Sequence, residues 1–427
     1  MAGTLAAPGG DRTITGKSSR KPASARKATP KGRRGNAGRI LTTHVGSLIR
    51  PPNLQEFLKA QRDREPYDPA AFDACLHDAV ADVVHKQAEI GLDVINDGEY
   101  GKTISWSRYV LERMSGFEQR DRTAHAGMPA AVAGRDRREF AEFYTDYDRH
   151  QGFTGMTGWA LTGPIRYTGH AAIARDIANF KAAAKGAKTG GLFMAAVAPA
   201  SVAPDRTDEY YKSDEEYVFA IADALHEEYK AIIDAGLTLQ VDDAYLALTY
   251  EVMVPPKTLK DYRKWATLRI EALNHALRGL PEERTRYHVC WGSWNGPHAF
   301  DVELKDIVDL ILKVRVGGYL LEMANPRHEH EWRVWERVKL PKGRMLIPGV
   351  ISHATNVVEH PELVAERLVR LAKLVGRDNL MAGTDCGFAQ GPFVQRVHPS
   401  IMWAKLRTLV EGARLASKHP GEHRRAA

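Results

Sequence analysis

Short apolar runs alternate with longer amphipathic segments along most of the chain. Eight of these runs, centred near residues 41, 94, 194, 239, 288, 320, 348 and 382, are typical of buried strands. The segments between them, such as 68–90, 213–235 and 361–375, carry apolar residues at helical spacing. Eight strands that alternate with helices predict an α/β fold, a (β/α)8 barrel of the TIM type. A doubly wound sheet is the alternative, but no Gly-x-Gly-x-x-Gly opens a first helix.

Local signals indicate where several helices begin and end. Ser213 and Glu216 form the pattern of a capping box, and a glycine at 236 stops that helix. Pro361 in the first turn and Gly376 past the last turn bound a later helix. Further helices are predicted at 303–314 and 328–338.

Two regions depart from this alternation. Residues 100–190 mix polar and aromatic stretches, which predicts an inserted excursion, a hairpin with helices over the pocket. Residues 1–38 contain almost no large apolar side chain, so burial there cannot offset the entropy lost on ordering. We therefore predict a disordered basic tail at 1–38, a barrel at 39–418 and a C-terminal tail at 419–427.

Charge and cysteine content narrow the functional classes. The net charge is +7, but residues 1–38 alone carry +8, so the remainder carries −1 and gives no basis for a nucleic-acid partner. The sequence has no run of about 18 apolar residues, so we expect no membrane span. Only three cysteines occur, at 75, 290 and 386, which argues against disulfide scaffolding and predicts a cytoplasmic protein.

Ligand-type residues stand at the ends of three predicted strands. His288 and Cys290 lie two apart and so point to the same face. Glu322 and Cys386 end two later strands, and nitrogen, sulfur and carboxylate ligands together suit Zn²⁺ with an exchangeable position. The His-Glu-His run at 328–330 also looks metal-like, but it opens a helix and predicts a solvated first turn.

Polar residues at the ends of other strands are candidates for substrate binding. Gly46, Ser47, Glu99 and Asp242 end three strands, and His353 follows a fourth. In a barrel of this kind the chemistry collects at the C-terminal ends of the strands, so we expect these residues to face one pocket. Salt-bridge partners in the barrel mouth, or a solvated loop histidine at 353, are the alternatives for single members of this group.

Across roughly residues 39–415, the chain resembles the C-terminal catalytic barrel of cobalamin-independent methionine synthase. The matching pieces are Thr43-His44-Val45-Gly46-Ser47, Asp97-Gly98-Glu99, Gln240-Val241-Asp242-Asp243, His288-Val289-Cys290, Glu322, Pro348-Gly349-Val350 with His353, and Asp385-Cys386-Gly387. By that resemblance, the zinc ligands would be His288, Cys290, Glu322 and Cys386. The amino-acid part of the substrate would be held by Gly46, Ser47, Glu99 and Asp242, and His353 would relay a proton near the transferred methyl group.

The resemblance implies a zinc-dependent S-methyltransferase of methionine biosynthesis, which activates a small thiol as a zinc thiolate. Homocysteine would be the acceptor and methionine the product, with 5-methyltetrahydrofolate or another methyl donor, which a separate corrinoid protein could supply. Three features depart from the family. The segment after Glu99, with Tyr100-Gly101-Lys102 and Trp106-Ser107-Arg108-Tyr109, differs from the family's folate-facing pattern. The family's Asp-Glu-Pro is here Asp242-Asp243-Ala244, and its full-length members carry a second, N-terminal barrel for which this chain is expected to have no room.

Two alternatives remain open. One is alkyl transfer like that of epoxyalkane–coenzyme M transferase, in which the thiol carries a sulfonate and would need a cationic clamp such as Arg327 or Lys102. The other is a barrel without catalytic activity whose zinc is structural. Structural zinc sites typically take ligands close in sequence, whereas 98 positions separate His288 from Cys386.

Overall fold

The structure is a computed structural model that describes residues 38–120, 134–151, 158–203 and 206–419. The predicted tails at 1–38 and 419–427 lie outside these residues, apart from Gly38 and His419. Within the described residues, no helix is both long and apolar enough to cross a membrane.

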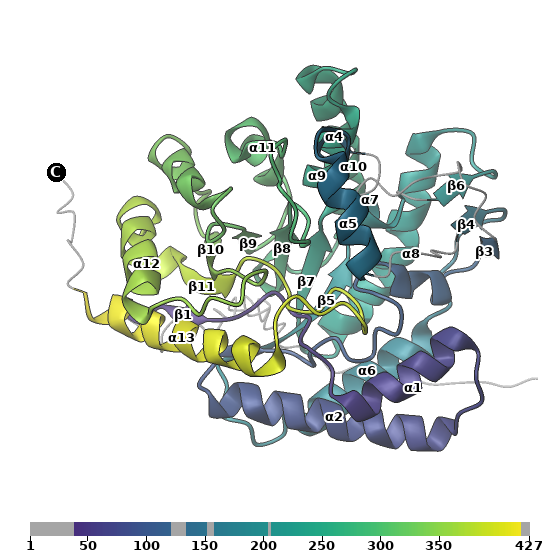
Figure 1. Cartoon of the computed structure of the whole chain (residues 1–427), viewed down its shortest axis with the longest axis horizontal. Helices are drawn as coiled ribbons and strands as arrows, with labels where there is room; N and C mark the ends of the chain where they lie inside the picture. Colours follow the sequence, from purple (N-terminus) through teal and green to yellow (C-terminus); the bar gives the residue numbers. More distant parts are fainter. Residues whose placement is uncertain (1–37, 121–133, 152–157, 204–205, 420–427) are drawn as a thin grey trace, which may run out of the picture. The chain divides into compact units, whose positions relative to one another are not determined.

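Eight parallel strands form one sheet, which confirms the predicted α/β barrel (Figure 1). Each predicted strand is present. In spatial order they are β1 (Leu41–Thr42), β11 (Met381–Thr384), β10 (Met345–Ile351), β9 (Gly318–Leu321), β8 (Thr285–Val289), β7 (Thr238–Asp243), β5 (Gly191–Val197) and β2 (Val94–Ile95).

The two ends of this sheet are joined through one aspartate. The carboxylate of Asp93, just before β2, accepts hydrogen bonds from the backbone N–H and the hydroxyl of Thr42 in β1, at 2.9 and 3.0 Å. The Asp93 backbone N–H donates to the Thr42 carbonyl at 3.2 Å. The side chain of Arg39 holds the same carboxylate at 2.6 Å. A short polar seam between β1 and β2 therefore nearly closes the barrel.

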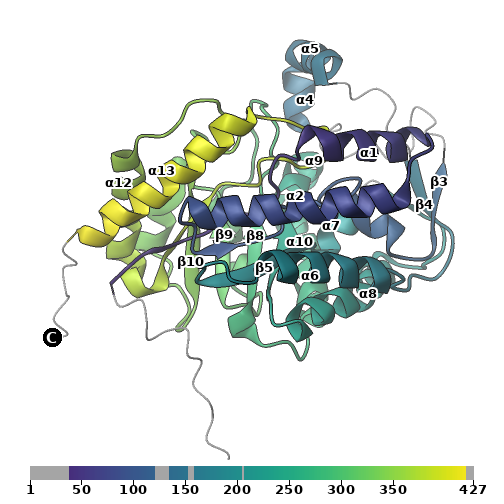
Figure 2. The ribbon, with the colours of Figure 1, turned by 90° about the horizontal axis from the view of Figure 1, so that it is seen from below.

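Each strand is followed by a helical segment that covers the outside of the sheet. The α-helices of this layer are α1 (Pro52–Asp63), α2 (Pro69–Glu89), α6 (His170–Ala183), α8 (Asp214–Asp234), α10 (Leu259–Ala276), α11 (Leu304–Ile311), α12 (Pro361–Val375) and α13 (Pro399–Lys418). Shorter α7 (Pro199–Val202) and α9 (Tyr245–Met253) follow β5 and β7. Figure 2 shows α1, α2 and α6 side by side on one flank.

The predicted helix ends are largely confirmed. Ser213 caps α8 by accepting from the Glu216 N–H at 3.1 Å, but the Glu216 carboxylate bonds the N–H of Lys212, so only half of the capping box forms. α12 has the predicted bounds, with Gly376 past its end. The helix predicted at 328–338 is present at Glu329–Glu336, as the 3₁₀ helix η4.

The predicted excursion is an insertion between β2 and α6. β3 (Phe117–Arg120) and β4 (Gly158–Leu161) pair antiparallel as the expected hairpin, and β6 (Arg206–Asp208) adds a third strand. The helices α4 (Arg135–Glu139) and α5 (Ala141–Gln151) also belong to it.

One aspartate of α4 ties the excursion to the loop after β8. The Asp136 carboxylate accepts from the backbone N–H groups of His298 and Ala299, both at 3.0 Å. It also accepts from the hydroxyl of Tyr144, which in turn accepts from the Trp294 indole at 2.9 Å. The excursion thereby fixes a loop at the C-terminal ends of the strands.

Candidate active site

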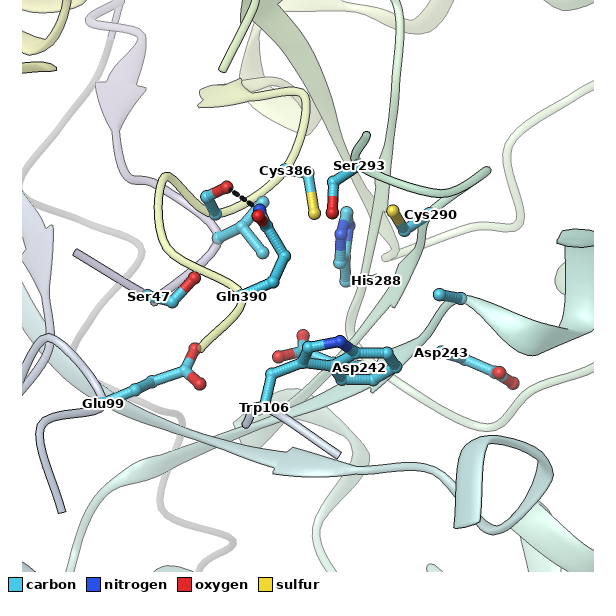
Figure 3. A pocket seen from close by; sticks show the side chains of 13 residues that line it. Ser47, Glu99, Trp106, Asp242, Asp243, His288, Cys290, Ser293, Cys386 and Gln390 are labelled. Carbon is cyan, nitrogen blue, oxygen red and sulfur yellow. Dashed lines mark hydrogen bonds between the residues drawn. The ribbon is translucent and has the colours of Figure 1, made fainter. Parts of the chain in front are cut away.

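One cavity opens at the C-terminal ends of the strands, with about 350 Å³ of empty volume (Figure 3). Cys290, Cys386, His288 and Ser293 gather on one side of it, and Glu99, Trp106 and Asp242 lie on another. The lining residues are Val45, Ser47, Glu99, Trp106, Asp242, Asp243, Ala244, His288, Cys290, Ser293, Cys386, Gly387 and Gln390. Most of the predicted ligand and substrate-binding residues at the strand ends therefore line one cavity, as expected.

Three of the four predicted ligands form a compact cluster. His288 stands in β8, and Cys290 follows that strand with its backbone N–H bonded to the Asp243 carbonyl at 3.0 Å. Cys386 follows β11. The ligand atoms of the three side chains lie within 4.8 Å of one another, and all three residues are buried. The alternation of side chains along β8 places His288 and Cys290 on the same face, as predicted.

The chemistry of this cluster fits a zinc ion. Neither ring nitrogen of His288 makes a hydrogen bond, although both are buried. Burial lowers the pKa of His288 to about 3, so its imidazole is neutral and keeps a free lone pair. The adjacent Cys386 and burial raise the pKa of the Cys290 thiol well above its usual value. A bound cation would reverse that shift and would satisfy the unpartnered imidazole.

Glu322 lies beside this cluster without belonging to the compact group of three. Its carboxylate is within hydrogen-bonding reach of the Cys290 thiol. One oxygen accepts from the Trp291 backbone N–H at 2.9 Å, and the other accepts from the Asn325 amide, also at 2.9 Å. Burial and the nearby Asp385 raise the pKa of Glu322 to about 7. Metal ligation by Glu322 therefore stays a prediction.

Asp385 holds the loop that carries Glu322. One of its oxygens accepts from the backbone N–H groups of Met323 and Ala324, both at 2.8 Å. The other accepts from Asn325 at 3.2 Å. Asn325 also bonds Glu322. Asp385, which precedes Cys386, therefore orients the carboxylate of Glu322, which lies next to Cys290.

The second wall of the cavity carries the predicted substrate-binding residues. Ser47, Glu99 and Asp242 line it. Gly46, with a φ of 146°, lets the Glu99 carboxylate approach so closely that a Cβ at position 46 would overlap it. The amide of Gln240 donates to the Asp242 carboxylate at 2.7 Å. The prediction that these four positions bind substrate is consistent with this placement and is not tested by it.

A lysine balances part of the charge on this wall. The Lys102 ammonium donates to Glu99 at 2.8 Å, and both side chains are buried. Burial and the neighbouring Glu99 raise the pKa of Asp242 well above its usual value, and Lys102 opposes that shift. The sequence suggested Lys102 only as an alternative clamp, because its pairing with Glu99 depends on how the chain turns after β2.

His353 is buried and is not among the residues that line the cavity. Neither of its ring nitrogens makes a hydrogen bond. Burial, together with the positive charge of Arg396, lowers the pKa of His353 to about 3. The imidazole is therefore neutral near neutral pH. Its predicted role as a relay remains a prediction.

The prediction of a solvated turn at 328–330 is wrong for its first residue. His328 is 3% exposed and lies between two carboxylates, Glu331 at 2.9 Å and Asp301 at 3.1 Å. Its ring also packs on Trp291, with 4.8 Å between the ring centroids. No local pattern in the sequence indicates this burial, because Asp301 stands 27 residues earlier.

Two further cavity residues were not predicted, because they lie in regions whose sequence has no clear strand or helix periodicity. Trp106 belongs to the excursion, and Gln390 lies on the loop after β11, where its amide donates to the Gly387 carbonyl. The Trp106 backbone N–H donates to the Gln390 carbonyl at 3.0 Å, so the excursion and the last loop close the cavity together.

Comparison with known proteins agrees with this geometry. Residues 206–411 match the family model described as the catalytic domain of cobalamin-independent synthase. A 2-hydroxypropyl-CoM lyase of Xanthobacter autotrophicus is 27% identical over 424 residues, which cover 92% of this chain and 99% of the relative. A methionine synthase of Sulfolobus acidocaldarius is 25% identical over 349 residues, which cover 81% of this chain and 85% of the relative.

A solved structure shares the fold. The B12-independent methionine synthase from Shewanella sp. W3-18-1, in complex with selenomethionine, superposes with a TM-score of 0.65. It is 20% identical and covers 88% of this chain and 97% of its own. Residues 206–411 thus match the catalytic domain of the cobalamin-independent synthase family, and the chain is similar along most of its length to transferase-type enzymes of that family.

Proposed function

We propose that this protein is a zinc-dependent transferase that methylates a small thiol, with homocysteine as the acceptor and methionine as the product. The observation that carries the proposal is the meeting of His288, Cys290 and Cys386 at one side of a cavity whose other wall holds Glu99 and Asp242. A thiol-binding metal cluster and two carboxylates for an α-ammonium group are the two features that such an acceptor requires.

The proposed division of roles follows from this placement. His288, Cys290 and Cys386 would hold the zinc ion, with Glu322 as a fourth ligand. Zinc, when bound, supplies a positive charge that lowers the pKa of the acceptor thiol. Glu99 and Asp242 would bind the ammonium group, and Ser47, beside Gly46, would bind the carboxylate of the acceptor.

The proposed reaction exchanges an S–H bond for an S–C bond. The acceptor sulfur takes the methyl group, the bond between that methyl group and the donor breaks, and the departing group takes up a proton. His353, neutral and buried next to Arg396 and the backbone of Ser293, is the proposed relay for this proton. A methylated folate, or a methyl group delivered on a corrinoid protein, would meet these requirements.

Alkyl transfer to coenzyme M is the second candidate function. It is favoured by Lys102, a buried cation bonded to the wall of the cavity, and by the relative that is a 2-hydroxypropyl-CoM lyase. The other cation suggested by the sequence, Arg327, is exposed and lies beside a different hollow, with Asp301 and His330. Lys102 is thus the cation that would favour the sulfonate of coenzyme M, through its contact with the cavity-lining Glu99.

Zinc-edge X-ray absorption on the zinc-loaded protein, with and without L-homocysteine, tests the proposal. We expect the number of sulfur ligands to rise from two to three with homocysteine. A rise with coenzyme M alone would assign the site to the second candidate function. No change with either thiol would contradict thiol activation and would leave a structural zinc site.

A further inference from the structure

Lys102 is a buried residue that contacts the wall of the cavity through Glu99 and is not itself among the lining residues. Its ammonium bonds Glu99 at 2.8 Å and lies 4.7 Å from the centre of the Tyr109 ring. The side chains of Lys102 and Glu99 are 8% and 3% exposed. A lysine that is buried to this degree and paired with a cavity-lining carboxylate changes the electrostatic potential inside the cavity.

The turn that carries Lys102 is held by an arginine. The Arg50 guanidinium donates to the carbonyl oxygens of Glu99 and Lys102, at 2.7 and 2.8 Å. The Lys102 backbone N–H donates to the Glu99 carbonyl at 3.1 Å, and the Tyr100 hydroxyl donates to the carbonyl of Ile49 at 2.9 Å. These contacts fix the spacing between the lysine and the carboxylate.

The charges on this wall would be unbalanced without the lysine. Glu99 and Asp242 both line the cavity, and two buried carboxylates repel each other and any anionic ligand. Lys102 offsets the negative charge of Glu99. The wall then repels a thiol that carries a carboxylate or sulfonate less strongly. The carboxylate oxygens can still bind an ammonium group on a thiol that has one.

We propose that Lys102 determines which thiols this site accepts: by offsetting the charge of Glu99, it admits acceptors that carry an anionic group, a carboxylate or a sulfonate. The inference rests on the proposed function, because it assumes that a thiol binds at the metal cluster. Lys102 acts through Glu99 and is a positioning residue in this proposal.

Three two-carbon thiols that differ only in their end group test the proposal: cysteamine (cationic), 2-mercaptoethanol (neutral) and coenzyme M (anionic). Their affinities for the zinc-loaded full-length protein are measured by calorimetry, together with L-homocysteine. In Lys102→Met we expect the affinity for coenzyme M, relative to that for cysteamine, to fall at least about tenfold. The affinity for 2-mercaptoethanol stays unchanged, and Lys102→Arg keeps the original ratio.

Matched variants separate the effect of the lost Lys102 charge from a structural effect of the substitution. Lys230→Met removes an exposed lysine paired with Asp234 and should leave every ratio unchanged. Glu99→Gln should shift the ratio toward coenzyme M, and the double variant Glu99→Gln/Lys102→Met should return it toward the original value. Glu99→Gln also tests the proposal if Lys102→Met does not fold.

The outcomes distinguish this inference from the proposed function. An unchanged ratio in Lys102→Met, while all thiols still bind, would overturn the inference and leave the proposed function in place. Failure of the unaltered protein to bind any thiol, 2-mercaptoethanol included, would overturn the proposed function. If the inference holds, the thiol that loses more affinity in Lys102→Met, homocysteine or coenzyme M, identifies which anionic group Lys102 serves.

Discussion

Among single residues, Cys386 offers the most direct test of the metal cluster, because it comes from a different strand end than His288 and Cys290. Cys386→Ala removes one of two sulfur ligands, and we expect zinc affinity to fall at least about 100-fold. Zinc per chain, measured by mass spectrometry after dialysis against a zinc buffer, checks this. Cys75→Ala, a half-buried thiol in α2, is the control and should keep its zinc. Full zinc content in Cys386→Ala would rule out ligation by this residue.

The protonation states of the cluster predict how zinc affinity depends on pH. The pKa of His288 is about 3, so its imidazole needs no deprotonation at neutral pH. The pKa of Cys290 is raised well above its usual value, so zinc must displace at least this proton. We expect affinity to rise about tenfold per pH unit between about pH 6 and 8. Competition titrations with a chromogenic chelator measure this slope, and an affinity independent of pH would contradict thiolate ligation.

Among the elements, η4 begins directly after the buried His328. Burial alone would lower the pKa of His328, but its hydrogen bonds to Asp301 and Glu331 raise it to about 10. His328→Gln should therefore destabilise the fold by about 3 kcal/mol. Because the folded pKa lies above the unfolded value of about 6.5, this stabilisation is complete below about pH 6.5 and is lost as the pH approaches 10. Urea unfolding of both proteins at pH 6 and pH 9.5 checks this, and an equal difference at both would contradict it.

The elements also show what the sequence could predict. The eight strands and their helices follow local periodicity, and the candidate ligands follow because strand ends meet at one face of a parallel barrel. The burial of His328, the pairing of Lys102 with Glu99 and the tie between α4 and the loop after β8 depend on contacts that local patterns do not encode. The 3₁₀ geometry of η4 was missed because its apolar spacing also fits an α-helix.

For the whole molecule, zinc at this site would link the middle of the chain to its last strand. A ligand that binds only the folded state stabilises it, by about 4 kcal/mol at a thousandfold excess over its Kd. Chelation of the zinc-loaded protein should therefore lower the Tm by several degrees in scanning calorimetry. Cys386→Ala should have a lower Tm that no longer responds to the chelator. A Tm insensitive to chelation in both proteins would show that the metal does not couple to folding.

The position of Cys386 after β11 also has a consequence for how the protein is made. The ribosome releases His288 and Cys290 long before Cys386, and β11 is the strand against which β1 pairs. A nascent chain therefore holds only two of the three residues of the metal cluster until β11 and Cys386 have been made. Any ion at this site is acquired late, by a chain whose other strands are already made. Supply of the metal would then limit how much active protein accumulates, without limiting how much protein is synthesised.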